Sequence, residues 1–86
     1  MLNYKLVKSW RKFKKYAVIL SDGTIIHFGD TRFKDFRSHA DKTKQFKYLS
    51  RASKIRDKNG RLTINNPKSA NYWAARVLWN YKNFNN

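Results

Sequence analysis

Both histidines and three of the five acidic residues lie in the stretch His27–Asp41, which reads HFGDTRFKDFRSHAD. A histidine beside a carboxylate can act as a general base, and several such side chains can hold a catalytic metal ion. The side chains that would form such a centre, a His-Asp nuclease site, are those of His27, Asp30, His39 and Asp41. Each of these residues also has a simpler structural role, which depends on the elements that position it.

A β-hairpin is the clearest element around this stretch. Two apolar runs, YAVIL and TIIHFG, flank Asp22-Gly23, a pair of residues that strongly favours a tight turn between strands. A two-residue turn would place His27 opposite Val18, as a half-buried strand histidine. Both faces of the hairpin are apolar, so we expect a helix on one face and another strand or a partner on the other. Residues 3–10 can supply the third strand.

A connecting segment, TRFKDF, follows the hairpin and is predicted to form a single helical turn. We expect its two aromatic side chains, Phe33 and Phe36, to point inward. Asp35 lies between Lys34 and Arg37 in the sequence. A local ion pair with these two neighbours is sufficient to account for the carboxylate.

Two helices are predicted in the second half of the chain. Asp41 is a suitable N-cap for a basic helix over residues 42–54, whose apolar stripe includes Phe46. Ser69 is a suitable N-cap for a helix over residues 70–80, which is apolar almost all round and should therefore be buried. The aromatic side chains expected in the core are those of Phe28, Phe46, Trp73 and Trp79.

These elements define a small α+β domain, with an antiparallel sheet built on a β-hairpin at about residues 16–29 and the two helices packed on it. A chain of 86 residues is expected to form one domain. The domain spans residues 16–80, between a basic N-terminal segment at 1–15 and an Asn-rich tail at 81–86.

Charge is the dominant feature of the composition. The chain has 20 Lys and Arg residues against 5 acids, which gives a formal net charge of +15. Solubility alone needs a net charge of only about 2–8 on a small domain. A larger charge opposes compaction by self-repulsion unless negative groups neutralise it. The composition therefore predicts a polyanion or an acidic protein surface as the partner.

Several classes of site and location are disfavoured by the composition. Without cysteine the chain has no disulfide framework and no thiolate ligand for a metal, and we expect neither a metal nor a cofactor. Its 3 Gly residues are too sparse for a phosphate-binding loop. No apolar run approaches the roughly 18 residues of a membrane span, and the N-terminal apolar run is too short for a signal peptide.

The basic residues fall into two groups, interleaved with aromatic side chains. Lys and Arg neutralise phosphates and release counterions, and exposed aromatic rings can stack on unpaired bases. The contacts expected from the N-terminal segment are Lys5, Lys8, Arg11, Lys12, Lys14 and Lys15, with Trp10 and Phe13 as stacking candidates. The contacts expected from the first helix are Lys42, Lys44, Lys47, Arg51 and Lys54.

The combined motifs resemble a family of small basic proteins encoded by tailed bacteriophages and nucleocytoplasmic large DNA viruses. The residues that carry the resemblance are Phe28-Gly29, Asp35-Phe36, His39, Asp41, Arg51, Trp73 and Leu78-Trp79, within about residues 16–80. This chain departs from the family pattern in its long basic N-terminal segment and in lacking the Pro that often follows the capping Asp. The resemblance implies a viral or phage origin, and it leaves the shared His and Asp as fold determinants.

We therefore expect a non-enzymatic, virion-associated accessory or structural protein of a DNA virus or phage. Its basic surface would bind an acidic capsid or portal surface, or packaged nucleic acid, within a larger assembly and away from membranes. The alternative is a nucleic-acid-binding protein without sequence preference that acts in the host cytoplasm. The His-Asp nuclease is the third hypothesis.

Overall fold

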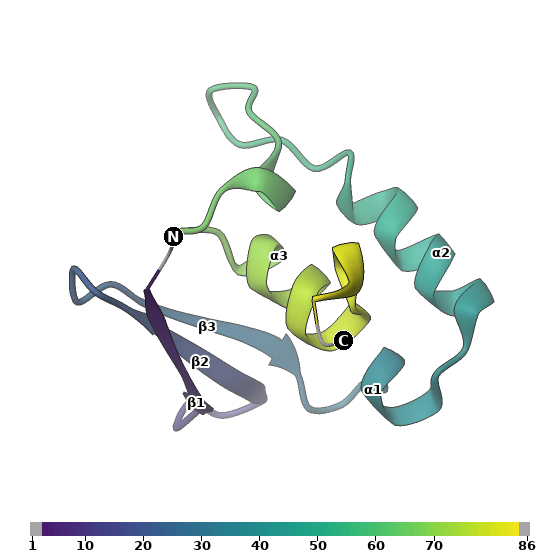
Figure 1. The fold of residues 1–86 in the computed structure, drawn as a ribbon, viewed down its shortest axis with the longest axis horizontal. Helices are drawn as coiled ribbons and strands as arrows, with labels where there is room; N and C mark the ends of the chain where they lie inside the picture. The colour runs from purple at the N-terminus through teal and green to yellow at the C-terminus, as the bar shows by residue number, and fades with distance from the viewer. Residues whose placement is uncertain (1–2, 85–86) are drawn as a thin grey trace.

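Three antiparallel strands form a sheet at one end of the molecule (Figure 1). They are β1 (Tyr4–Lys8), β2 (Lys14–Leu20) and β3 (Ile25–Asp30), with β2 in the middle. The structure is a computed structural model, and it describes residues 3–84. The predicted hairpin and third strand are confirmed, and with the helices below they make the fold α+β.

The basic N-terminal segment is part of the sheet. β1 pairs with β2 along its whole length, so the boundary drawn at residue 15 falls inside β2. The outermost residues of the predicted segment and tail, 1–2 and 85–86, lie outside the described part of the chain.

The hairpin register differs by one residue from the prediction. Val18 pairs with Ile26 and not with His27. The turn is longer than two residues, and within it the N–H of Gly23 donates to the carbonyl of Leu20 at 2.9 Å. Gly23 has a φ of +88°, a left-handed conformation that glycine adopts without steric cost. The longer turn shifts every pair in the hairpin.

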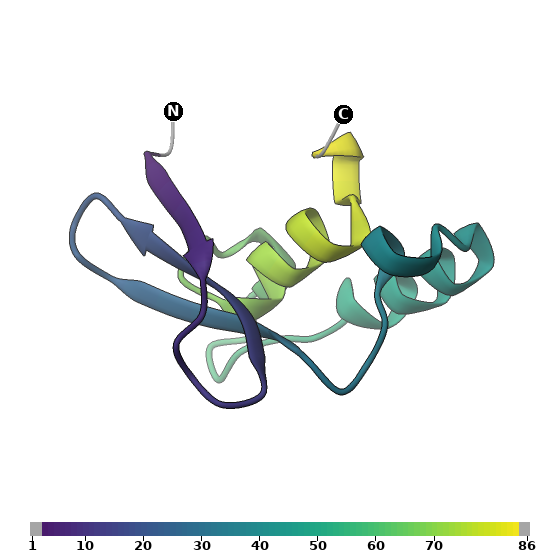
Figure 2. The same ribbon diagram turned by 90° about the horizontal axis from the view of Figure 1, so that it is seen from below.

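Within residues 3–84, six helical elements follow the sheet, and Figures 1 and 2 show how they are arranged. Three of them correspond to the two predicted helices: α2 to the first, and the continuous pair α3–η2 to the second. Their bounds are α1 (Phe36–His39), α2 (Lys42–Ala52), the 3₁₀ helix η1 (Thr63–Asn65), α3 (Ala70–Trp73), the π-helix η2 (Ala74–Leu78) and the 3₁₀ helix η3 (Tyr81–Asn83). Among these described residues no helix is long and apolar enough to cross a membrane.

The continuous helix α3–η2 lies between the sheet and α2 (Figure 1). On one side Trp73 and Val77 pack against the inner face of the sheet, in one buried cluster with Phe28. On the other side Ala75 packs against Ala52 of α2, in a second buried cluster. The prediction that this helix is buried on nearly all sides is confirmed.

Two predictions about aromatic residues are wrong. Phe46 is 73% exposed and Phe33 is 68% exposed. On an α-helix, which turns about 100° per residue, Phe46 lies about 200° from Tyr48. The helix α2 packs through Tyr48, Leu49 and Ala52, and of these Leu49 alone lies near the direction of Phe46. Phe46 is therefore at the edge of the packed face, where its ring is directed into solvent.

Candidate functional site

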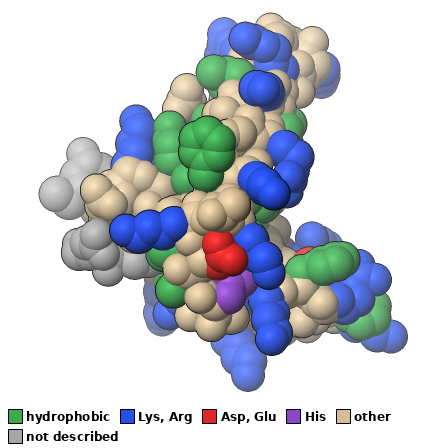
Figure 3. Space-filling model, turned by 90° about the vertical axis from the view of Figure 1, so that its right-hand side faces the viewer, with side chains coloured by type: hydrophobic (Ala, Val, Ile, Leu, Met, Phe, Trp, Pro, Cys, Tyr) green, Lys and Arg blue, Asp and Glu red, His purple; other side chains and the backbone are tan. Residues whose placement is uncertain are grey.

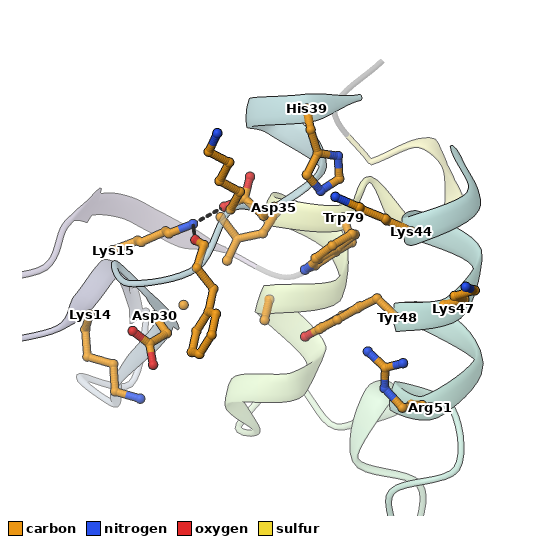
Figure 4. Close-up of a pocket in the computed structure, with 15 residues that line it drawn as sticks. Lys14, Lys15, Asp30, Asp35, His39, Lys44, Lys47, Tyr48, Arg51 and Trp79 are labelled. Carbon is orange, nitrogen blue, oxygen red and sulfur yellow. Dashed lines mark hydrogen bonds and ion pairs between the residues drawn. The ribbon is translucent and has the colours of Figure 1, made fainter. Parts of the chain in front are cut away.

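A cleft of about 720 Å³ opens between the end of the sheet and α2 (Figure 4). Ala74 and Leu78 of η2 contribute to its apolar lining. Gly29 of β3 also borders it, where a Cβ atom would come within 2.8 Å of Leu78 Cδ1. The close packing of β3 on η2 therefore depends on glycine at this position.

The two basic groups predicted from the sequence meet at this cleft. Figure 4 shows Lys15 on the sheet side, with Lys44 and Arg51 extending from α2 on the other side. Lys and Arg side chains are also spread over the face of the molecule shown in Figure 3. The cations that line the cleft are Lys14, Lys15 and Lys34 on one side and Lys44, Lys47 and Arg51 on the other.

The ammonium group of Lys15 is bound by other residues of the fold, so it is less available to a partner than predicted. Its ammonium group lies 2.5 Å from the carboxylate of Asp35 and donates to the carbonyl of Phe33 at 2.7 Å. Asp35 is only 4% exposed, and its other oxygen caps α1 by accepting from the N–H of Arg37. The prediction that Asp35 pairs with its sequence neighbours is therefore wrong, because its ionic partner lies on β2.

Aromatic residues form one wall of the cleft. Tyr48 and Trp79 stack with their ring centroids 4.3 Å apart and their planes 8° apart. The side chain of Gln45 holds this arrangement by donating to the carbonyl of Trp79 at 2.8 Å. Burial raises the pKa of the Tyr48 phenol, so it stays neutral at physiological pH. Sequence reasoning missed both residues as site residues.

His39 places a hydrogen-bond donor at the edge of the aromatic wall. Its Nδ1 accepts a hydrogen bond from the backbone N–H of Asp41 at 2.9 Å, so the neutral ring carries its proton on Nε2. Nε2 is buried and has no hydrogen-bond partner among residues 3–84. A buried polar group without a partner costs about 1–3 kcal/mol. The ring centroid lies 5.4 Å from that of Trp79, and both residues line the cleft.

The other predicted cations lie outside the cleft. Lys5 and Lys8 lie on β1, and Arg11 and Lys12 lie in its connection to β2. Lys42 lies at the N-terminus of α2, and Lys54 lies beyond the end of α2. The predicted cations that do not line the cleft are Lys5, Lys8, Arg11, Lys12, Lys42 and Lys54. The structure therefore divides the predicted set into cleft residues and a more widely distributed basic surface.

The exposure expected for Trp10 and Phe13 is confirmed, at 62% and 47%. The Phe13 ring already has cations beside it, with Lys12 Nζ at 5.0 Å and Arg32 at 4.9 Å from its centroid. Trp10 meets His27 edge to face at 4.7 Å. Stacking of either ring on a base stays a prediction.

The four residues of the hypothetical nuclease centre have separate structural roles. His27 is half-buried and its Nδ1 lies 2.9 Å from the hydroxyl of Ser9; desolvation and the nearby cationic side chains lower its pKa. Asp30 is bound by the Arg32 guanidinium at 2.8 and 3.0 Å. Asp41 caps α2, as predicted. Among residues 3–84 no three His or acidic side chains form a group that could hold a metal ion.

The fold and the cleft define a class of protein: a small, strongly basic α+β domain with a cleft bordered by cations. Residues 4–52 match the model of DUF5754, a family of unknown function, and since this is more than half of the chain, the protein belongs to that family. The matched part runs from β1 to the end of α2, so it includes both basic sides of the cleft. Comparisons with curated proteins and with solved structures give no match.

Proposed function

We propose that this protein binds nucleic acid through the phosphate backbone, without sequence preference and without catalysing a reaction. The observation that carries the proposal is the convergence of cations from the sheet and from α2 on one open cleft. The two carboxylates that line the cleft, Asp30 and Asp35, already have cationic partners in Arg32 and Lys15. The remaining positive charge is available to an anionic ligand.

Phosphate groups suit this arrangement better than a single small anion. Lys side chains are flexible point charges, and each phosphate that they neutralise releases counterions, which drives binding regardless of base sequence. Lys8 of β1 borders a smaller hollow together with Lys14 and Lys15, so the basic surface continues from the cleft onto β1. A long polyanion can contact both regions at once.

The proposed setting is the particle of a DNA virus or phage, as the resemblance implies. Packaged nucleic acid would there compensate the net charge of +15. Mass spectrometry of purified particles tests this setting, since a virion protein copurifies with the particle. Detection only in infected-cell extract would instead support the alternative of a factor that acts in the host cytoplasm.

Binding itself is tested by fluorescence anisotropy with a labelled oligonucleotide at several NaCl concentrations. The logarithm of affinity should fall linearly with the logarithm of salt concentration. A variant with Lys14, Lys44 and Lys47 changed to Gln should bind more weakly and show a salt slope smaller by about two to three. The matched control changes three exposed lysines outside the cleft, Lys42, Lys54 and Lys58, to Gln.

Equal losses in the two variants would show that overall charge, and not the cleft, determines binding. No binding to DNA or RNA at low salt would contradict the proposed function. If the protein then bound polyglutamate, an acidic protein surface would become the better candidate for its partner.

A further inference from the structure

The cleft is lined by both cationic and apolar side chains, and the backbone of a duplex would use only the cationic ones. Its rim is cationic, but the side chains of Phe33, Ala74, Leu78 and Trp79 give it an apolar interior. Phosphate oxygens gain nothing from apolar surface, whereas a planar aromatic group gains both burial and stacking. A ligand that fills this cleft therefore needs an aromatic part beside its negative charge.

We propose that the cleft takes an unpaired nucleotide of a single strand, an inference that rests on the proposed function. The base lies against the wall formed by Tyr48 and Trp79, and the adjacent phosphates contact cations of the rim, including Lys44 and Arg51. A base in a duplex is paired and stacked and presents only its edge to a protein. An unpaired base can present its face.

The size of the cleft fits this ligand. Its volume of about 720 Å³ lies within the range of roughly 300–1,000 Å³ that is usual for small-molecule sites. Phe33 borders the cleft and is 68% exposed. Its carbonyl is bound by Lys15 on the sheet side of the cleft, across from α2, so its ring is in a position to contact a base that lies against the Tyr48–Trp79 wall.

His39 supplies a polar contact that such a ligand can use. Its Nε2–H is buried beside the aromatic wall and has no partner in the described chain. A base carbonyl or a phosphate oxygen would accept this hydrogen bond and remove the cost of leaving the donor unpaired. Asp35 also borders the cleft, but its ion pair with Lys15 limits its repulsion of the ligand.

The test compares probes with equal numbers of phosphates. These are a single-stranded dT12, the corresponding U12, a 12-residue abasic strand and a GC-rich duplex of six base pairs, all carrying 5′-phosphates so that each holds 12 phosphates. Each probe is titrated against the full chain by anisotropy. The proposal expects dT12, U12 or both to bind about fivefold or more tightly than the abasic strand, from base stacking. The duplex should bind no better than the abasic strand.

Two variants of exposed aromatic residues locate the effect. Phe33→Ala should weaken binding of the single strand while leaving binding of the abasic strand unchanged. Phe46→Ala is the matched control, because Phe46 is 73% exposed and lies outside the cleft. Neither side chain is part of the core, so both variants should fold.

The possible failures can be distinguished. If the abasic strand or the duplex binds as tightly as dT12, the base does not enter the cleft and this inference is overturned, while phosphate binding stands. If no probe binds, the proposed function itself fails. If free dTMP competes as strongly as dT12, the cleft is a mononucleotide site and the single-strand proposal is overturned.

Discussion

The ion pair between Lys15 and Asp35 connects the sheet to the segment that leads into α1. Both side chains are largely removed from solvent, with 18% of Lys15 and 6% of Asp35 exposed. In such a pair, attraction and desolvation nearly cancel, but removing one partner leaves the other as an uncompensated buried charge. The contribution of the pair to the stability of the fold is therefore seen mainly when one of its partners is removed.

Lys15→Ala should lower the free energy of unfolding by about 3–5 kcal/mol, because Asp35 would remain buried without a counter-ion. The neighbouring Lys14→Ala removes the same type of side chain from an exposed position and should cost less than about 0.5 kcal/mol. Urea denaturation of both variants measures the difference. Equal midpoints would show that Asp35 does not depend on Lys15.

The pKa values of two aspartates outside the core predict how the stability of the fold depends on pH. Hydrogen bonds from Thr24 and then Lys68 lower the pKa of Asp22 to about 2, and the Arg32 side chain lowers that of Asp30 to about 2. Their ordinary value is 3.8, so as pH falls the unfolded chain takes up these protons before the folded one does. Stability should therefore decline as pH falls from about 4 towards 2.

The measurement is the urea midpoint at pH 5 and at pH 2.5. Wild type should lose more stability between these two values than a variant in which Asp22 and Asp30 are both changed to Asn. A variant with the same loss as wild type would mean that other groups cause the acid sensitivity.

The contact between β3 and η2 carries the next prediction, because it depends on Gly29. This residue has a φ of +81°, and an added Cβ would lie 2.8 Å from Leu78 Cδ1 and 3.1 Å from Lys15 Cβ. Gly29→Ala combines backbone strain of about 1–2 kcal/mol with an overpacking cost of about 1–3 kcal/mol. The free energy of unfolding should fall by the sum of these two effects.

Gly23→Ala is the control that separates the two contributions. Its φ of +88° gives similar strain, but no atom lies within 4 Å of the added Cβ. The cost should be about 1–2 kcal/mol, from strain alone. If both alanine variants lost the same stability in urea denaturation, the contact of β3 with η2 would be loose.

The elements of this fold were predictable where the signals were local. Asp22-Gly23 indicated the hairpin, and Asp41 and Ser69 marked the starts of two helices, where both side chains accept backbone hydrogen bonds. The register was not predictable, because it depends on turn length, and Asp-Gly is compatible with turns of two or three residues. The burial of α2 was uncertain because apolar residues such as Phe46 lie on more than one of its faces.

The cleft was predictable only in part. Composition identified the cations, but their convergence depends on how α2 lies relative to the sheet, which no local pattern encodes. The pairing of Lys15 with Asp35 joins residues 20 positions apart. Trp79 was predicted as a core residue, and only the packing shows that it also borders the cleft.

At the scale of the whole molecule, salt should affect folding and binding in opposite directions. The net charge of +15 repels itself in the compact state, and added NaCl screens that repulsion. The urea midpoint of the free protein should therefore rise between 10 and 200 mM NaCl, over which the Debye length shortens from about 30 Å to less than about 8 Å. A midpoint that fell with salt would mean that ion pairs such as Lys68–Asp22 outweigh the repulsion.

A single-stranded oligonucleotide should reverse this dependence. A ligand that binds only the folded state, at about 100 times its Kd, stabilises it by about 2.7 kcal/mol. Because salt weakens phosphate binding, this added stability should be largest at low salt, where the free protein is least stable. Denaturation with and without dT12 at each NaCl concentration gives two curves that converge as salt rises. Parallel curves would show that the stabilisation does not come from phosphate contacts, and the charge of the chain would then need another explanation.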